Sequence, residues 1–290
     1  MISDPETGST DPWLEEATNV ISKVSVQAQP RVLIELNRIA RQPDVSFESV
    51  ADLVVKDVGL CAKLLKLASS PMFSNGQRFD CVQDALMTIG FQEFRRCFLS
   101  VSIECFIGKV GYPYRGFWDH SMRVASFCQV LAERFCPQHA FQAYTLGLFH
   151  DVGAVLIPMY NKSYADHIAR ALPLYFGITE LEYALVKTNH CAVGELFARN
   201  WSLSEDILIP LRHHHNPNFD EEWSDTTREL KAILQLAELL NDKIEKKSDT
   251  YTPFSQSKDT LVRICGVLGF GPQVLPELEQ DLLVALEGDK

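Results

Sequence analysis

Residues 117–153 read FWDHSMRVASFCQVLAERFCPQHAFQAYTLGLFHDVG and contain two helical patterns in succession. In the first, side chains that share one face recur at i, i+4, i+8, i+11 and i+15: His120, Val124, Cys128, Leu131 and Phe135. This spacing predicts a helix that Asp119 caps and whose core-facing stripe begins with His120. The second pattern begins at about residue 140 and ends at the pair His150-Asp151, with Gly153 just beyond. The stretch therefore predicts two neighbouring helices, each of which carries a histidine toward the core.

The helical period continues along almost the whole chain, and the sequence has no convincing alternation of the kind that strands show. An all-α fold is therefore predicted. Ser46 and Asp57 are expected to cap helices, and Gly90 is expected to end one. Further helices are predicted over residues 12–26, 32–39, 46–55, 57–67, 81–89, 93–107, 180–199, 207–212, 227–246 and 274–286.

The length of 290 residues suits about two lobes of ~150 residues each. Gly108, Gly111 and Pro113 interrupt the helical pattern, so residues 108–116 are the best candidate boundary between the lobes. The predicted organisation is a leader with a first helix (1–23), a helical lobe (24–110), a second helical lobe with the candidate site (111–246) and a partly helical tail (247–290).

Composition and charge exclude several classes of protein. With 46% hydrophobic and 22% charged residues, the chain is neither collagen-like nor of low complexity nor wholly disordered. A formal net charge of −11 argues against non-specific binding to nucleic acid. Residues 1–13 lack the pattern of a secretion signal, and the most apolar stretches are interrupted by His, Asp, Arg or Glu. We therefore expect a soluble, cytoplasmic protein with no membrane partner.

The eight cysteines form no CxxC pair and lie mostly inside apolar runs, so they are expected to be reduced thiols that fill the core. The histidines are more informative. Five of them fall at the ends or on the inner faces of separate predicted helices, with two carboxylates in the same pattern: His120, His150, His190, His214 and His215, with Asp151 and Glu238. His139, His167 and His213 lack partners in this pattern and are left outside the site.

This mixture of imidazole and carboxylate groups suits one or two divalent transition metals (Fe, Mn, Ni or Zn) better than Ca or Mg. A single inward histidine is more often a core residue that is hydrogen-bonded to the backbone. Burial of all five without a shared partner would be costly, so an ion, an ordered water network or true exposure must compensate.

The order of these residues, in FWDHSMRVA (117–125), GLFHDVG (147–153), NHCAVGELFARNW (189–201) and RHHHNP (212–217), resembles the HD superfamily of metal-dependent phosphohydrolases. The stretches VADLVVKDVGLCAKLLKLASSPMF (50–73) and DCVQDALMTIGF (80–91) resemble the HDOD branch, so the resemblance covers residues 24–242. It implies an all-helical module of bacterial signalling and regulatory proteins, often without demonstrated catalysis. By similarity to the related HD-GYP phosphodiesterases, the seven residues above fall on ligand positions.

Three positions depart from the HD-GYP pattern. Ala154 stands where a lysine would hold a substrate phosphate, Gly116 replaces an acidic residue, and NPNF (216–219) replaces the GYP segment. Arg123 or Arg212 could hold a phosphate instead, although such arginines more often lie in surface salt bridges.

Two hypotheses follow from the resemblance. The first is a signal-transduction module with a structural or ligand-sensing metal site, whose partners are signalling proteins and a small phosphorylated ligand. The second is an HD-type phosphohydrolase that acts on a nucleotide or a cyclic dinucleotide.

Overall fold

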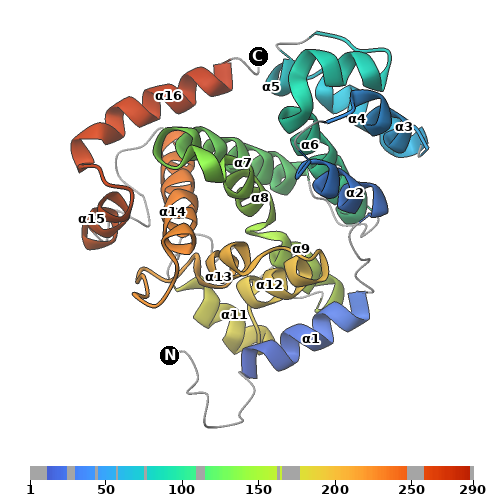
Figure 1. The fold of residues 1–290 in the computed structure, drawn as a ribbon. Helices are drawn as coiled ribbons and strands as arrows, with labels where there is room; N and C mark the ends of the chain where they lie inside the picture. The colour runs from blue at the N-terminus through green and yellow to red at the C-terminus, as the bar shows by residue number, and fades with distance from the viewer. Residues whose placement is uncertain are drawn as a thin grey trace. The chain divides into compact units, whose positions relative to one another are not determined.

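The computed structural model describes residues 12–24, 30–42, 45–56, 58–74, 77–108, 115–161, 164, 177–246 and 258–287. All regular secondary structure in these ranges is helical (Figure 1), which confirms the all-α prediction. The chain divides into two compact units, one formed by Met1–Gln27 with Tyr112–Leu275 and one by Ala28–Gly111 with Pro276–Lys290. The predicted domain limits stay a prediction, because residues 109–114 lie outside the described ranges.

The smaller unit is built on its longest helix, α6 (Val82–Gly108), against which α3 (Phe47–Val54), α4 (Val58–Ala68) and α5 (Pro71–Ser74) pack. Gly90 has a φ of 80° and divides α6 at the point where the sequence predicted a helix end. The Ser46 hydroxyl accepts a hydrogen bond from the Ser49 N–H at 3.3 Å, as expected of a cap, whereas Asp57 lies outside the described residues. The other helices of this unit are α2 (Arg31–Ile39) and α16 (Leu275–Glu287).

The larger unit contains the candidate site. Its elements are α1 (Pro12–Val24), α7 (Arg115–Phe135), the 3-10 turn Pro137–His139, α8 (Ala140–Phe149), α9 (Val152–Tyr160), α11 (Ile178–Val186), α12 (His190–Asn200), α13 (Glu205–His213), α14 (Asp225–Lys246), α15 (Lys258–Val267) and the 3-10 turn Pro272–Val274. Helix α14 packs against α7, α8, α13 and α15, while α12 packs against α1, α9 and α13. These contacts bring segments distant in sequence to one place.

Two glycines permit close helix contacts beside the site. A Cβ on Gly147 of α8 would lie 2.8 Å from the Ala125 Cα atom of α7. A Cβ on Gly153 of α9 would lie 2.0 Å from the carbonyl oxygen of His190, which begins α12. Since real Cβ atoms do not approach other atoms this closely, the pairs α7–α8 and α9–α12 both depend on glycine at these positions.

Two helix predictions are wrong in detail. Helix α7 already begins at Arg115, so Asp119 lies inside the helix and does not cap it. Phe117 and Trp118 in the added turn are partly buried, and packing outweighs a cap worth about 1 kcal/mol. The predicted helix 180–199 is broken into α11 and α12. Lys187, with a φ of 61°, ends α11, and the Asn189 side chain caps α12 by accepting the Ala192 N–H at 2.8 Å. The sequence patterns did not predict α9 and α15 at all.

Within the described ranges, the stretch Pro137–Tyr160 is long and apolar enough to span a membrane by composition alone. The bent helix pair Asp259–Val267 and Pro272–Leu286 meets the same criterion only if it is taken as one span. In the first stretch, which forms the 3-10 turn, α8 and α9, 78% of the 18 residues that meet the criterion are buried. Its apolar character is therefore explained by packing in the core, and the polar pair His150-Asp151 interrupts it between α8 and α9.

Candidate metal centre

All seven side chains that the sequence singled out lie in the larger unit, and the structure brings them together. The Nε2 atoms of His120 and His150 are 3.3 Å apart. The Nε2 atom of His190 lies 3.3 Å from that of His214 and 2.9 Å from that of His215. Glu238 on α14 completes the set, with its Oε1 atom 3.7 Å from the His150 Nε2 atom. Five helices or helix junctions thus converge on one cluster.

Asp151 lies between two groups of histidines. Its Oδ2 atom is 3.2 Å from the Nε2 atom of His150 and 3.9 Å from that of His120. Its Oδ1 atom is 3.5 Å from the Nε2 atom of His190 and 3.8 Å from that of His214. Each oxygen of the carboxylate faces a different histidine group, which is the arrangement that a carboxylate bridging two metal ions requires.

Hydrogen bonds at the outer ring nitrogens fix the tautomers of the inner histidines. The Nδ1 atom of His150 is 2.7 Å from the Gly147 carbonyl oxygen, and that of His214 is 2.8 Å from the Leu211 carbonyl oxygen. A carbonyl oxygen can only accept, so both Nδ1 atoms carry hydrogen and donate it. In the neutral rings, the Nε2 lone pairs therefore point into the cluster, as metal-ligating imidazoles do.

His190 is oriented in the same way by a carboxylate that sequence reasoning missed. Its Nδ1 atom is 2.7 Å from the Glu182 Oε2 atom, which also accepts the His190 backbone N–H at 3.1 Å. The Tyr164 hydroxyl donates to the other oxygen of Glu182. A buried carboxylate that holds the outer nitrogen of an imidazole is a common support of metal ligands, because it fixes the ring and raises its basicity.

The distances test whether the cluster fits a cation. Ligand nitrogens bound at 2.0–2.1 Å from a metal lie about 2.9 Å apart in octahedral and about 3.3 Å apart in tetrahedral geometry. The observed Nε2–Nε2 separations of 2.9–3.3 Å fall in this range. Two lone pairs that face each other at such distances repel unless a proton or a cation lies between them, so the donor set fits a transition metal.

The charges of the cluster are strongly coupled. Burial raises the pKa of Asp151, but the neighbouring histidines, His150 first, outweigh burial and hold the pKa well below its usual range. Burial lowers the pKa of His214, and the adjacent Cys191 and Asp151 reverse this and bring it to about 10. For His215, burial and the charges of its neighbours together hold the pKa well below its usual range. Without a metal, protons therefore take the place of the cation.

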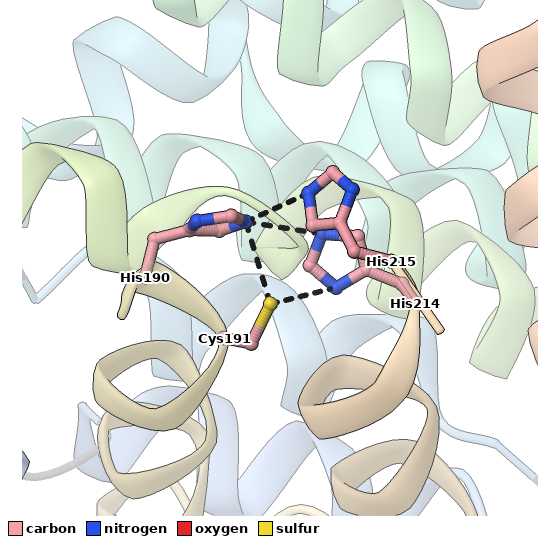
Figure 2. Close-up of side chains that lie close together, drawn as sticks. All are labelled: His190, Cys191, His214 and His215. Carbon is pink, nitrogen blue, oxygen red and sulfur yellow. Dashed lines mark hydrogen bonds between the residues drawn. The ribbon is translucent and has the colours of Figure 1, made fainter. Parts of the chain in front are cut away.

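Cys191 is a second residue that sequence reasoning missed, because it was counted among the core thiols. It lies directly after His190 at the start of α12, and its Sγ atom is 3.4 Å from the His190 Nε2 atom (Figure 2). Burial by itself raises its pKa, and the positive charges of His190 and His214 lower it to about 7. The NHC sequence at 189–191 was the available signal, since a cysteine that follows a predicted ligand shares its helical turn.

The potential metal ligands fall into two sets. The first contains His190, Cys191, His214 and His215, all of them buried. The second contains His120, His150 and Asp151, of which His120 and Asp151 are 28% and 27% exposed. The second set is therefore the side of the cluster that solvent or a ligand reaches.

Known proteins share sequence and fold with this chain. The model of the HDOD domain matches residues 26–217, which is more than half of the chain. The chain belongs to the HDOD domain family. A solved structure of an HDOD domain protein with unknown function from Geobacter sulfurreducens shares the fold, with a TM-score of 0.77 and 23% identity over 97% of this chain and 99% of that one.

Two curated relatives of this HDOD chain are longer than it is. An uncharacterized protein of Treponema pallidum (strain Nichols) is 25% identical over 80% of this chain and 44% of its own length. The cyclic di-GMP phosphodiesterase CdgJ of Vibrio cholerae is 26% identical over 47% of this chain and 31% of its own length. The HDOD chain thus spans less than half the length of these relatives.

The remaining candidates of the HDOD chain lie outside the cluster. The Arg123 Nε atom donates to the Asn241 Oδ1 atom at 2.6 Å, and the Asn241 Nδ2 atom is 3.5 Å from the His120 Nδ1 atom. The Arg212 Nε atom lies 4.0 Å from the Glu195 Oε2 atom, so the expected salt bridge is present, but its side chains are only 12% and 13% exposed and it does not lie on the surface.

Three histidines were left outside the site. The ring nitrogens of His139 lie 2.8 Å from the Gln142 Oε1 atom and 3.2 Å from the Thr226 Oγ1 atom. His213 is partly buried against the ring of Trp223, outside the cluster. His167 lies outside the described residues.

Proposed function

We propose that this HDOD chain is a signal-transduction module whose larger unit holds a binuclear transition-metal centre, and that it lacks efficient phosphohydrolase turnover. The observation that carries the proposal is the position of Asp151, whose two oxygens face two separate groups of Nε2 atoms. The residues that would hold the ions are His120, His150, Asp151, His190, His214, His215 and Glu238.

The protein side chains have distinct parts in such a centre. The Glu182 carboxylate and the carbonyl oxygens of Gly147 and Leu211 hold the inner rings in the tautomer that leaves their Nε2 atoms free to bind a cation. The bound metals would supply Lewis acidity and a coordinated water with a pKa of about 7. The exposed edges of His120 and Asp151 form the side at which a ligand can approach.

The contacts of the two arginines support a regulatory function. Phosphoryl transfer needs cationic groups that position the phosphate oxygens, and the lysine that would do this in the HD-GYP pattern is replaced by Ala154. Arg123 is hydrogen-bonded to Asn241, and Arg212 pairs with Glu195. Both arginines therefore already interact with protein side chains.

A second candidate function is metal-dependent hydrolysis of a nucleotide or a cyclic dinucleotide. The open side at His120 and Asp151 favours it, because a metal that keeps a position open to solvent can activate a bound water for hydrolysis. The name of the relative CdgJ, a cyclic di-GMP phosphodiesterase, agrees with this candidate.

Metal content and hydrolysis, measured on the same preparation, separate these functions. The protein is reconstituted with Mn or Fe, its metal is counted by elemental analysis, and hydrolysis of cyclic di-GMP and of bis(p-nitrophenyl) phosphate is compared with His150→Ala. We expect two metal ions per chain and no hydrolysis beyond that of His150→Ala. Turnover that His150→Ala abolishes would establish the hydrolase instead, and a protein that binds no metal would remove the centre itself.

The proposed partners follow from the same function. They are signalling proteins, which the helical surface would contact, and a small phosphorylated ligand at the open side of the centre. A cytoplasmic location belongs to this proposal as well, and the eight free cysteines support it because thiols persist in reducing compartments.

A further inference from the structure

Cys191 places a thiol within one of the two ligand groups. It is buried, and its Sγ atom is 3.4 Å from the His190 Nε2 atom and 3.7 Å from the His214 Nδ1 atom. Figure 2 shows the sulfur and the rings of His214 and His215 gathered beside one ring nitrogen of His190. One ligand atom from each of the four residues lies within 4.8 Å of all the others.

The distances from the His190 Nε2 atom to its neighbours agree with the edges of a metal coordination sphere. In a tetrahedral site with metal–nitrogen bonds of 2.0–2.1 Å and metal–sulfur bonds of about 2.3 Å, neighbouring nitrogen and sulfur atoms are about 3.5 Å apart. The Sγ–Nε2 distance of 3.4 Å in the first turn of α12 is close to this value. Of the two nitrogen pairs of the group, the one at 3.3 Å matches the tetrahedral edge, whereas the one at 2.9 Å is shorter and matches the octahedral edge.

We propose that Cys191 is a metal ligand, so that the two positions of the centre are chemically unequal. His190, Cys191, His214 and His215 supply three nitrogens and one sulfur to a buried position, which selects Zn²⁺ and which the Asp151 Oδ1 atom faces. His120, His150, Asp151 and Glu238 form an open nitrogen–oxygen position, which takes Mn²⁺ or Fe²⁺ and exchanges it. This inference rests on the proposed metal centre and adds the ligand that sets its metal selectivity.

Burial and ligand chemistry support the difference between the positions. Zinc sites with four protein ligands are typically structural and closed, whereas sites that keep an open position bind water or substrate. All four residues of the sulfur-containing group are buried, while His120 and Asp151 of the other group are 28% and 27% exposed. A thiolate favours zinc over Mn²⁺, since soft ligands select softer ions and carboxylates suit harder ones.

Cobalt loading of the full-length protein tests the thiolate directly. Bound Co²⁺ with a thiolate ligand shows a near-ultraviolet charge-transfer absorption that a site of nitrogen and oxygen ligands lacks. We expect this absorption in the wild type and in Cys136→Ser, a buried cysteine at the end of α7, and its loss in Cys191→Ser. We also expect Cys191→Ser to raise the Kd for zinc at least about tenfold while one exchangeable Mn²⁺ is kept.

X-ray absorption of the zinc-loaded wild type provides a test that needs no variant. One zinc–sulfur distance of about 2.3 Å is expected, and this result stands even if Cys191→Ser does not fold. Bound metal with only nitrogen and oxygen ligands would overturn the assignment of Cys191 and leave the binuclear centre intact. A wild type that binds neither cobalt nor zinc would overturn both this inference and the proposed function.

Discussion

Gly153→Ala tests whether the close contact between α9 and α12 sets the geometry of the metal centre. The new Cβ atom would lie 2.0 Å from the carbonyl oxygen of His190 and 2.8 Å from the backbone nitrogen of Gly194. Ordinary contacts begin near 3.4 Å, so His190 and Gly153 must separate by about 1.4 Å. Metal sites tolerate only about 0.2 Å of error in each ligand distance. The substitution is therefore expected to weaken metal binding as well as packing.

The expected cost of Gly153→Ala is about 1–3 kcal/mol, as for other overpacked cores. In a domain of this size each kcal/mol lowers Tm by about 2–4 °C, so a fall of about 2–12 °C is predicted. Thermal unfolding with and without added zinc, together with elemental analysis, measures both effects. We expect zinc to raise the Tm of the wild type clearly and that of the variant much less.

Gly194→Ala is the matched control, because it places the same extra methyl group on the facing helix. The nearest atom to its Cβ would be the Gly153 backbone nitrogen at 3.7 Å, which is ordinary contact. Alanine within a helix is favoured over glycine by about 1 kcal/mol, so its Tm is expected to stay the same or rise. A Gly153→Ala protein with wild-type Tm and full metal content would refute the reasoning.

Three further predictions concern the protons and supports of the centre. Burial lowers the pKa of His214, but the adjacent Cys191 thiolate and Asp151 carboxylate raise it to about 10, so a bound metal must displace a proton. The apparent metal affinity should therefore rise as the pH rises toward 10. Competition with a chromophoric chelator measures this affinity, and an affinity that falls with pH would contradict the prediction. Glu182→Gln removes the carboxylate that holds the His190 Nδ1 atom and should raise the Kd for metal about 10–100-fold. Glu180→Gln, at an exposed position, should leave this Kd unchanged. Equal Kd values for the two variants would contradict the role of Glu182 in orienting the His190 ring. Lys231→Met removes two hydrogen bonds to the carbonyl oxygens of Asn216 and Asn218, which follow His214 in the chain. The free energy of unfolding, measured by urea denaturation, should fall by about 1–3 kcal/mol, and an unchanged value would show that these bonds contribute nothing.

The parts of the site that depend on local spacing could be read from the sequence. His120 falls on the same stripe as Val124 and Cys128, and the structure buries the middle of that stripe while His120 stays 28% exposed. The pair His150-Asp151 lies at the end of α8, where its position was expected. These features follow from the helical period, because residues three or four apart must share a face.

Glu182 could not be assigned from the same pattern. In a continuous helix, residues eight apart lie about 12 Å from each other along the axis, so Glu182 and His190 would not meet. The break at Lys187 and Asn189 turns the chain and brings the Glu182 carboxylate to within 2.7 Å of the His190 ring. The Asn189 cap was the signal for this break, but apolar periodicity runs through it and hides it.

In the proposed centre, the ligands would come from five different parts of the fold. His120 comes from α7, Asp151 from the junction of α8 and α9, His190 from α12, His214 from the end of α13 and Glu238 from α14. Because no single element forms the site, the free energy of metal binding would stabilise the fold of the whole unit. This stabilisation is about 2.7 kcal/mol when the free metal concentration is a hundred times the Kd. A ligand that alters the open position changes the stability of every helix that supplies a ligand. Such a response needs bound metal and a ligand, but it does not need the phosphate-holding lysine that this chain lacks.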